Sequence, residues 1–111
     1  MTTINVKRVS VTVDASGAVA CTPDPVSVSG HNLCIAFSLD TPGYNFPDSG
    51  AIAVTQGGVQ FPYASWTLRP NLAGVYDANS AAGDFQYTVN VVNTSTGAMS
   101  SVDPGIKNSG Q

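Results

Sequence analysis

The chain has 111 residues, 42% of them hydrophobic and 10% charged, which is enough apolar content for one buried core and one domain. Its net charge of -3 comes from seven acids, all aspartates, against four lysines and arginines. A basic surface for nucleic acid is thereby excluded, and no stretch has the roughly 18 apolar residues of a membrane-spanning helix. We expect a single domain over residues 1–111, no nucleic-acid or membrane partner and, since no signal peptide is present, a cytoplasmic location.

Alternating apolar residues and frequent turn residues predict β-strands over the first half of the chain. In the first strand the apolar phase slips at Lys7-Arg8, which predicts a β-bulge there. Prolines at positions 23 and 25 fix their own φ angles and predict an extended corner. We expect the strands of this half to cover residues 4–13, 18–21, 26–28 and 33–39.

The second half of the chain has the clearest period-two alternation, from Phe85 to Val91. Trp66 and Leu68 share one face of an earlier strand, which predicts core positions for them. With turn signals about every 8–12 residues, the pattern predicts an all-β, immunoglobulin-like Greek-key β-sandwich of about seven to nine strands. Residues 104–111 are expected to be a C-terminal tail or the last strand.

Few residues are suited to a metal centre or a nucleophile. His31 is the only histidine, which excludes a copper site with two histidines. Asp77 and Asp84 lie near Asn79 in the sequence, but without the carboxylate-rich pattern of a calcium site. Cys21 and Cys34 are expected to be small buried hydrophobes. We therefore expect no metal and no cofactor.

The bond between Asp103 and Pro104 carries more specific chemistry. An aspartate carboxylate reaches its own main-chain carbonyl through a five-membered ring, and the tertiary amide nitrogen of proline is a comparatively good leaving group. Most Asp-Pro dipeptides in folded proteins are stable turn elements, so cleavage near neutral pH requires further groups. A proton donor to the proline nitrogen, or a base that directs a water molecule, contributes about 10²- to 10⁴-fold.

Another aspartate is the natural second group, because the chain has no glutamate and one histidine. Two carboxylates held close together raise the pKa of one of them and keep a proton available. Asp84 ranks first because it opens the long strand, and Asp77 ranks second because it precedes that strand. Asp24 belongs to a second Asp-Pro corner, Asp24-Pro25. The candidate catalytic residues are thus Asp103, Asp84 and Asp77, with Asp103-Pro104 as the cleaved bond.

The chain resembles the DP-EP family of small bacterial β-sandwich proteins. The resemblance rests on four stretches spread over almost the whole chain, residues 22–26 (TPDPV), 37–44 (FSLDTPGY), 83–89 (GDFQYTV) and 102–108 (VDPGIKN). It implies hydrolytic self-cleavage at the Asp-Pro bond near the C-terminus through a water molecule activated by an aspartate. It also implies that the short tail stays in place as a strand.

We therefore expect a single-turnover, aspartate-dependent endopeptidase whose substrate is its own Asp103-Pro104 bond. The competing class is a non-catalytic structural or interaction module that self-associates as a homo-oligomer through polar faces and edge strands. A third class is a small-ligand or carbohydrate binder, which would need an exposed aromatic platform at Tyr44, Tyr63 or Trp66.

Overall fold

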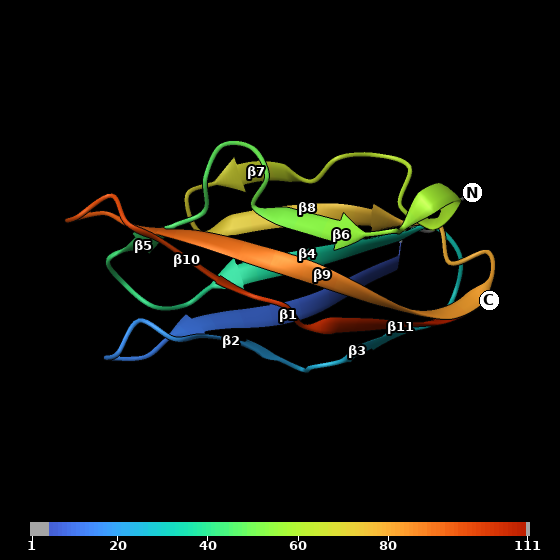
Figure 1. Cartoon of the computed structure of the whole chain (residues 1–111). Helices are drawn as coiled ribbons and strands as arrows, with labels where there is room; N and C mark the ends of the chain where they lie inside the picture. The colour runs from blue at the N-terminus through green and yellow to red at the C-terminus, as the bar shows by residue number, and fades with distance from the viewer. Residues whose placement is uncertain (1–4, 111) are drawn as a thin grey trace.

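The computed structural model describes residues 5–110, which form an all-β sandwich of two sheets (Figure 1). The prediction of this fold class is confirmed. The elements, in chain order, are β1 (Asn5–Val13), β2 (Val19–Thr22), β3 (Val26–Val28), β4 (Leu33–Leu39), β5 (Tyr44–Asn45), β6 (Ile52–Thr55), the 3₁₀ turn η1 (Gly58–Gln60), β7 (Trp66–Arg69), β8 (Leu72–Asp77), β9 (Ala82–Asn93), β10 (Met99–Val102) and β11 (Gly105–Ser109).

The first sheet has the strand order β2-β1-β4-β8-β7. Strand β1 runs parallel to β4, and their register continues without a shift from Asn5 opposite Leu33 to Val11 opposite Leu39. The predicted bulge at Lys7-Arg8 is therefore wrong. The apparent slip in the apolar pattern arises because Val6 lies on the solvent face, where it is 54% exposed.

The second sheet is organised around β9, which pairs along both of its edges (Figure 1). Strands β10 and β11 follow one another along one edge, and β6 and β5 lie along the other. Strand β3 pairs in parallel with the far side of β11. A period-two pattern over twelve residues gives β9 one face for the core and one for solvent.

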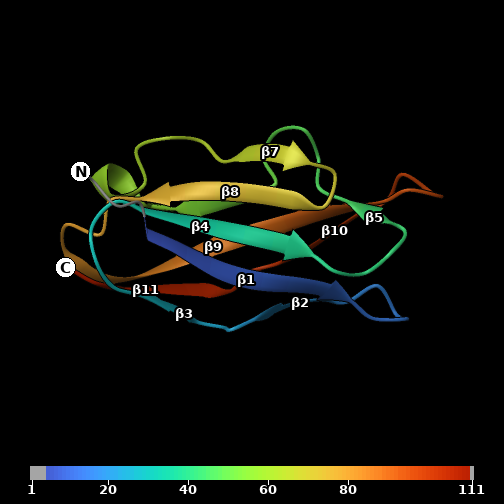
Figure 2. The same ribbon diagram turned by 180° about the vertical axis from the view of Figure 1, so that it is seen from behind.

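The segment from β2 to β3 crosses from the first sheet to the second. Strand β2 pairs with β1, whereas β3 pairs with β11, and the crossing lies at Pro23-Asp24-Pro25 (Figures 1 and 2). Both peptide bonds that precede these prolines are cis. The corner predicted from the two prolines thus brings the chain to β11, far from it in the sequence.

The core lies between the sheets and is built from the inward residues of both. Phe37 of β4 and Tyr87 of β9 are fully buried, and their ring centroids are 5.3 Å apart. Trp66 and Leu68 are not core residues, contrary to the prediction. Trp66 is half-buried on the outer face, where a Cβ added at Gly74 would lie 2.9 Å from its ring, and Leu68 is 64% exposed.

Residues 5–110 contain eleven strands, more than the seven to nine expected. Part of the difference arises because β10 and β11 are two pieces of one strand path, and because β5 has only two residues. The immunoglobulin-like Greek-key connection remains a prediction.

Candidate functional site

The Asp103-Pro104 bond joins β10 to β11 within one extended strand path. Val102 pairs with Val89 and Gly105 pairs with Gln86, so both strands share a single register along β9. The backbone N–H of Tyr87 donates to the Pro104 carbonyl over 2.9 Å. The bond is therefore not part of a tight turn. Pro104 has no N–H to donate in return, which leaves a gap in the hydrogen-bond ladder at the candidate bond.

The side chain of Asp103 is exposed and is held on the solvent face of this sheet. Thr88, directly across on β9, donates a hydrogen bond from its Oγ1 to Asp103 Oδ1 over 2.6 Å. The next pair along the same face, Ser101 and Asn90, is also joined by side chains at 2.6 Å. The carboxylate beside the candidate bond is thus both oriented and accessible to water.

The second carboxylate at the bond is that of Asp24. The Gly105 N–H donates to Asp24 Oδ1 over 2.9 Å, although the two residues are 81 positions apart in the sequence. Because the Pro104 carbonyl points toward β9, strand alternation directs the Gly105 N–H and the Asp103 carbonyl to the opposite side, where Asp24 lies. Asp24 therefore lies on the side toward which the Asp103 carbonyl points and contacts Gly105, two residues past Asp103.

The two Asp-Pro steps lie side by side because β3 and β11 are parallel. Val26 pairs with Ile106, which places Pro25 beside Gly105. A Cβ added at Gly105 would lie 3.3 Å from the Cβ of Pro25, so the two corners are in close contact. The repeated Asp-Pro dipeptide was the sequence signal for this arrangement. The local sequence pattern does not show that β3 pairs with β11 in the second sheet, whereas β2 pairs with β1 in the first.

The structure does not bring Asp84 or Asp77 to the bond. Asp84 shares the solvent face of β9 with Thr88 but lies four residues along the strand, about 13 Å away. Asp77, at the end of β8, is buried and accepts a hydrogen bond from Asn108 of β11. Asn108 is four residues from Pro104, again about 13 Å along an extended strand. Asp24, and neither of the two ranked candidates, is the aspartate next to Asp103-Pro104.

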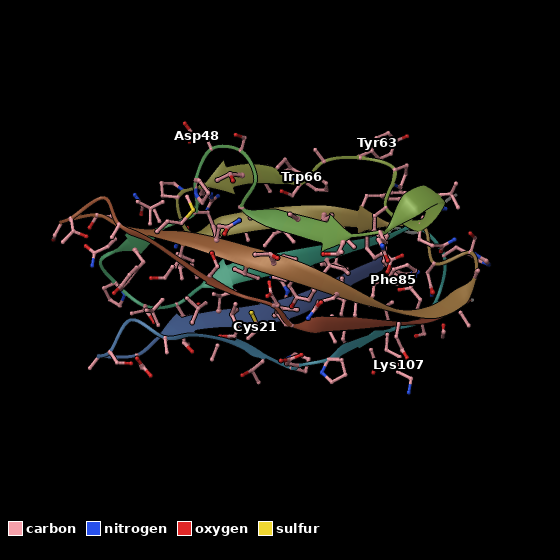
Figure 3. The ribbon with its side chains drawn as sticks, viewed as in Figure 1. Cys21, Asp48, Tyr63, Trp66, Phe85 and Lys107 are labelled. Atoms are coloured by element: carbon pink, nitrogen blue, oxygen red, sulfur yellow. The ribbon has the colours of Figure 1, made fainter. Side chains whose placement is uncertain are left out.

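Tyr87 and Cys21 lie beneath the bond, on the core side. The Tyr87 hydroxyl is beside the Cys21 thiol, and the charge of Asp24 acts on both groups. Burial raises the pKa of the Cys21 thiol to about 11 and also raises the pKa of Tyr87. Cys21 (labelled in Figure 3) is therefore a neutral thiol near pH 7 and a poor nucleophile, which leaves the carboxylates as the reactive groups at this position.

Other candidate sites are less developed in the structure. Among residues 5–110, no three His, Cys, Asp or Glu side chains are placed to hold a metal ion. Cys21 and Cys34 are both free and half-buried. Tyr63 and Trp66 are labelled in Figure 3. Tyr63 is 66% exposed, but its ring packs against that of Tyr76, and Trp66 covers Gly74, so neither forms a flat open platform for a sugar.

Comparison with known proteins finds no family model that matches this chain and no matching curated protein. The resemblance to the DP-EP family therefore remains a proposal. Within residues 5–110, no helix has the length and apolar character that crossing a membrane requires.

Proposed function

We propose that the protein hydrolyses its own Asp103-Pro104 bond once, as members of the DP-EP family are expected to do. The observation that carries this proposal is the hydrogen bond from the Gly105 N–H to Asp24 Oδ1 at 2.9 Å. It holds a second carboxylate next to the bond, on the side toward which the Asp103 carbonyl points. Asp103 and Asp24 are both exposed, so water reaches both groups.

In the proposed reaction the Asp103 carboxylate attacks its own main-chain carbonyl carbon. A C–O bond forms, the C–N bond to Pro104 breaks, and the proline nitrogen takes a proton from a water molecule bound to Asp24. The hydroxide that remains beside Asp24 opens the five-membered anhydride, and the proton released in this hydrolysis protonates the Pro104 amine. The products are a free α-carboxylate on Asp103 and a secondary ammonium on Pro104. Thr88 orients the attacking carboxylate, and such intramolecular positioning contributes up to roughly 7–11 kcal/mol to lowering a barrier.

The strand context also favours cleavage at this bond. The Pro104 nitrogen donates no ladder hydrogen bond, so its departure from Asp103 breaks none. Strand β11, which follows the break, keeps its pairing with β9 and β3, and β10, which precedes the break, keeps its pairing with β9. At the second Asp-Pro step, Asp24-Pro25, the aspartate carboxylate instead accepts a hydrogen bond from the Gly105 N–H.

A non-catalytic interaction module is the second candidate function. Leu68 on the edge strand β7 is 64% exposed, and Val59 of the 3₁₀ turn η1 is 81% exposed. Exposed apolar side chains beside an unpaired strand edge favour self-association as a homo-oligomer. This proposal requires no cleavage.

The test is a set of conservative exchanges followed by intact mass over days at pH 5 and pH 7. Asp103→Asn should abolish formation of the fragment that ends at residue 103, because an amide is a much weaker nucleophile than a carboxylate. Asp24→Asn should slow it by about 10²- to 10⁴-fold, the contribution of a positioned acid or base. Asp84→Asn is the matched control, since it makes the same exchange on the same sheet about 13 Å away.

The proposal predicts that Asp84→Asn cleaves at the wild-type rate and that the rate is independent of protein concentration. Equal rates in Asp24→Asn and wild type would remove Asp24 from the mechanism. No fragment in any sample would leave the interaction module as the surviving proposal.

A further inference from the structure

Asp77 and Asn108 form a buried pair that joins the two sheets at one end of the sandwich. Asp77 ends β8 and is 0% exposed, while Asn108 lies on β11 and is 3% exposed. Asn108 Nδ2 donates to Asp77 Oδ1 over 3.0 Å. The second oxygen of each side chain, Asp77 Oδ2 and Asn108 Oδ1, is also buried and has no hydrogen-bond partner. Figures 1 and 2 show that β8 and β11 end at this same end of the molecule.

A single proton on Asp77 would give both unpaired oxygens a hydrogen-bond partner. A carboxyl and a carboxamide that meet along one edge bring their other two polar atoms together, so a proton on Asp77 Oδ2 would be donated to Asn108 Oδ1. Turning the amide over exchanges the two edges and still leaves one oxygen facing another. An ionised Asp77 would leave both second oxygens without a donor in the observed orientation of the amide. With the amide turned over, Asn108 Oδ1 alone would lack a donor, because Asp77 Oδ1 still accepts the Asn79 N–H. Either orientation buries at least one unpaired acceptor, which native structures rarely tolerate.

Within residues 5–110, no positive charge is placed to stabilise an ionised Asp77. The titratable residues of the surrounding elements lie on outer faces or in a loop: Cys34 pairs with Tyr76 on the outer side of the first sheet, Lys107 pairs with Asp84 on the outer side of the second, and His31 is exposed. Burial raises the pKa of Asp77, and hydrogen bonds from Asn108 and the Asn79 backbone only partly oppose this effect.

The neighbouring residue Asn79 extends the same contact along the C-terminal strand. Its backbone N–H donates to Asp77 Oδ1 over 2.9 Å, and its Nδ2 donates to Ser109 Oγ over 3.2 Å. Its Oδ1 accepts the Gly110 N–H over 2.9 Å. The segment 77–79 thus binds three successive residues, 108–110, at the end of β11.

We propose that Asp77 is a neutral carboxylic acid in the folded protein and that, with Asn79, it forms a proton-dependent latch on the C-terminal strand. Loss of the Asp77 proton removes the donor to Asn108 Oδ1 and loosens β11 from β8. The latch acts in the intact chain and does not depend on cleavage at Asp103-Pro104.

The direction of the pH effect follows from the raised pKa. The folded state holds the Asp77 proton over a pH range in which the unfolded chain, with a pKa near 3.8, has lost it. The contribution of Asp77 to stability is complete below about pH 3.8 and is lost as pH rises to the folded-state pKa. Over this range the folding equilibrium constant falls by up to about tenfold per pH unit.

The direct test is a carbon-13 NMR titration of the side-chain carboxyls of the full-length protein. We expect Asp77 to titrate above its ordinary pKa of 3.8. Amide exchange over residues 106–109, corrected for intrinsic rates, should accelerate as Asp77 loses its proton. Titration of Asp77 at or below pH 3.8 overturns the proposal.

Asp77→Asn supplies the second test, because its amide pairs with Asn108 through two hydrogen bonds and carries no titrating proton. The free energy of unfolding of the variant, taken relative to that of the wild type, should increase as pH rises above about 4. This difference should then level off at higher pH. A constant difference across this range would contradict the latch. If the variant does not fold, the wild-type titration still decides.

Discussion

At the residue scale, Asp24 reaches Gly105 because the proline corner carries the chain from the first sheet to the second. The same corner leaves Cys21 beneath the Asp103-Pro104 bond, beside Tyr87. A cysteine near a labile peptide bond is a candidate nucleophile. The ionisation state of Cys21 distinguishes attack by a thiolate from attack by the Asp103 carboxylate.

Cys21 should resist alkylation in the folded protein. With a pKa of about 11, about one thiol in a thousand is ionised at pH 8, and the thiolate is the reactive form. Site-resolved mass spectrometry after iodoacetamide treatment should show slow labelling in buffer and rapid labelling in urea, where burial is lost. Equally rapid labelling in both conditions would restore Cys21 as a candidate nucleophile.

At the scale of elements, β11 is the strand on which both the candidate site and the latch depend. Its end is closely packed, because Gly110 has a φ of +86° and a Cβ added there would lie 2.6 Å from the backbone nitrogen of Ala82. Gly97, in the turn before β10, also has a positive φ, +74°, but nothing lies within 4 Å of its added Cβ. Substitutions at these two glycines therefore separate the cost of backbone strain from the cost of steric contact.

Gly110→Ala should therefore destabilise the protein more than Gly97→Ala does. The positive φ alone costs about 1–2 kcal/mol, and overpacking against the backbone of Ala82 adds about 1–3 kcal/mol. Urea unfolding gives both values as differences in the free energy of unfolding. Equal losses in the two variants would show that the end of β11 has room to move.

The sequence allowed the strands and the β-sandwich to be predicted because period-two alternation is a local signal, strongest in β9. Pairing between distant strands is not a local signal. Asp24 was assigned to a separate corner because nothing near it in the sequence indicates that β3 pairs with β11. Trp66 was placed in the core because alternation does not show which face of an edge strand is buried.

At the scale of the whole molecule, cleavage should leave the sandwich assembled. Residues 104–110 are held by the ladders of β11 with β9 and β3, by buried Ile106 and by the contacts of Asn108 with Asp77. Native mass spectrometry of cleaved protein should give the two fragments together, and denaturing conditions should separate them. Loss of the short fragment under native conditions would contradict this prediction.

Ile106→Ala is the matched variant for this prediction. It truncates a side chain of β11 that is 1% exposed, at an expected cost of about 2–5 kcal/mol. The short fragment should then dissociate more readily after cleavage, while Asp103, Thr88 and Asp24 remain in place. Retention as tight as in the wild type would mean that burial of Ile106 does not hold the strand.

The most direct test of the central claim is the intact mass of the wild-type protein, followed over days at pH 5 to 7 under denaturing detection. Self-hydrolysis predicts two species, one ending at Asp103 and one beginning at Pro104, whose summed mass exceeds that of the intact chain by one water. They should appear at a rate that does not change on dilution. A single species of unchanged mass throughout would contradict the account.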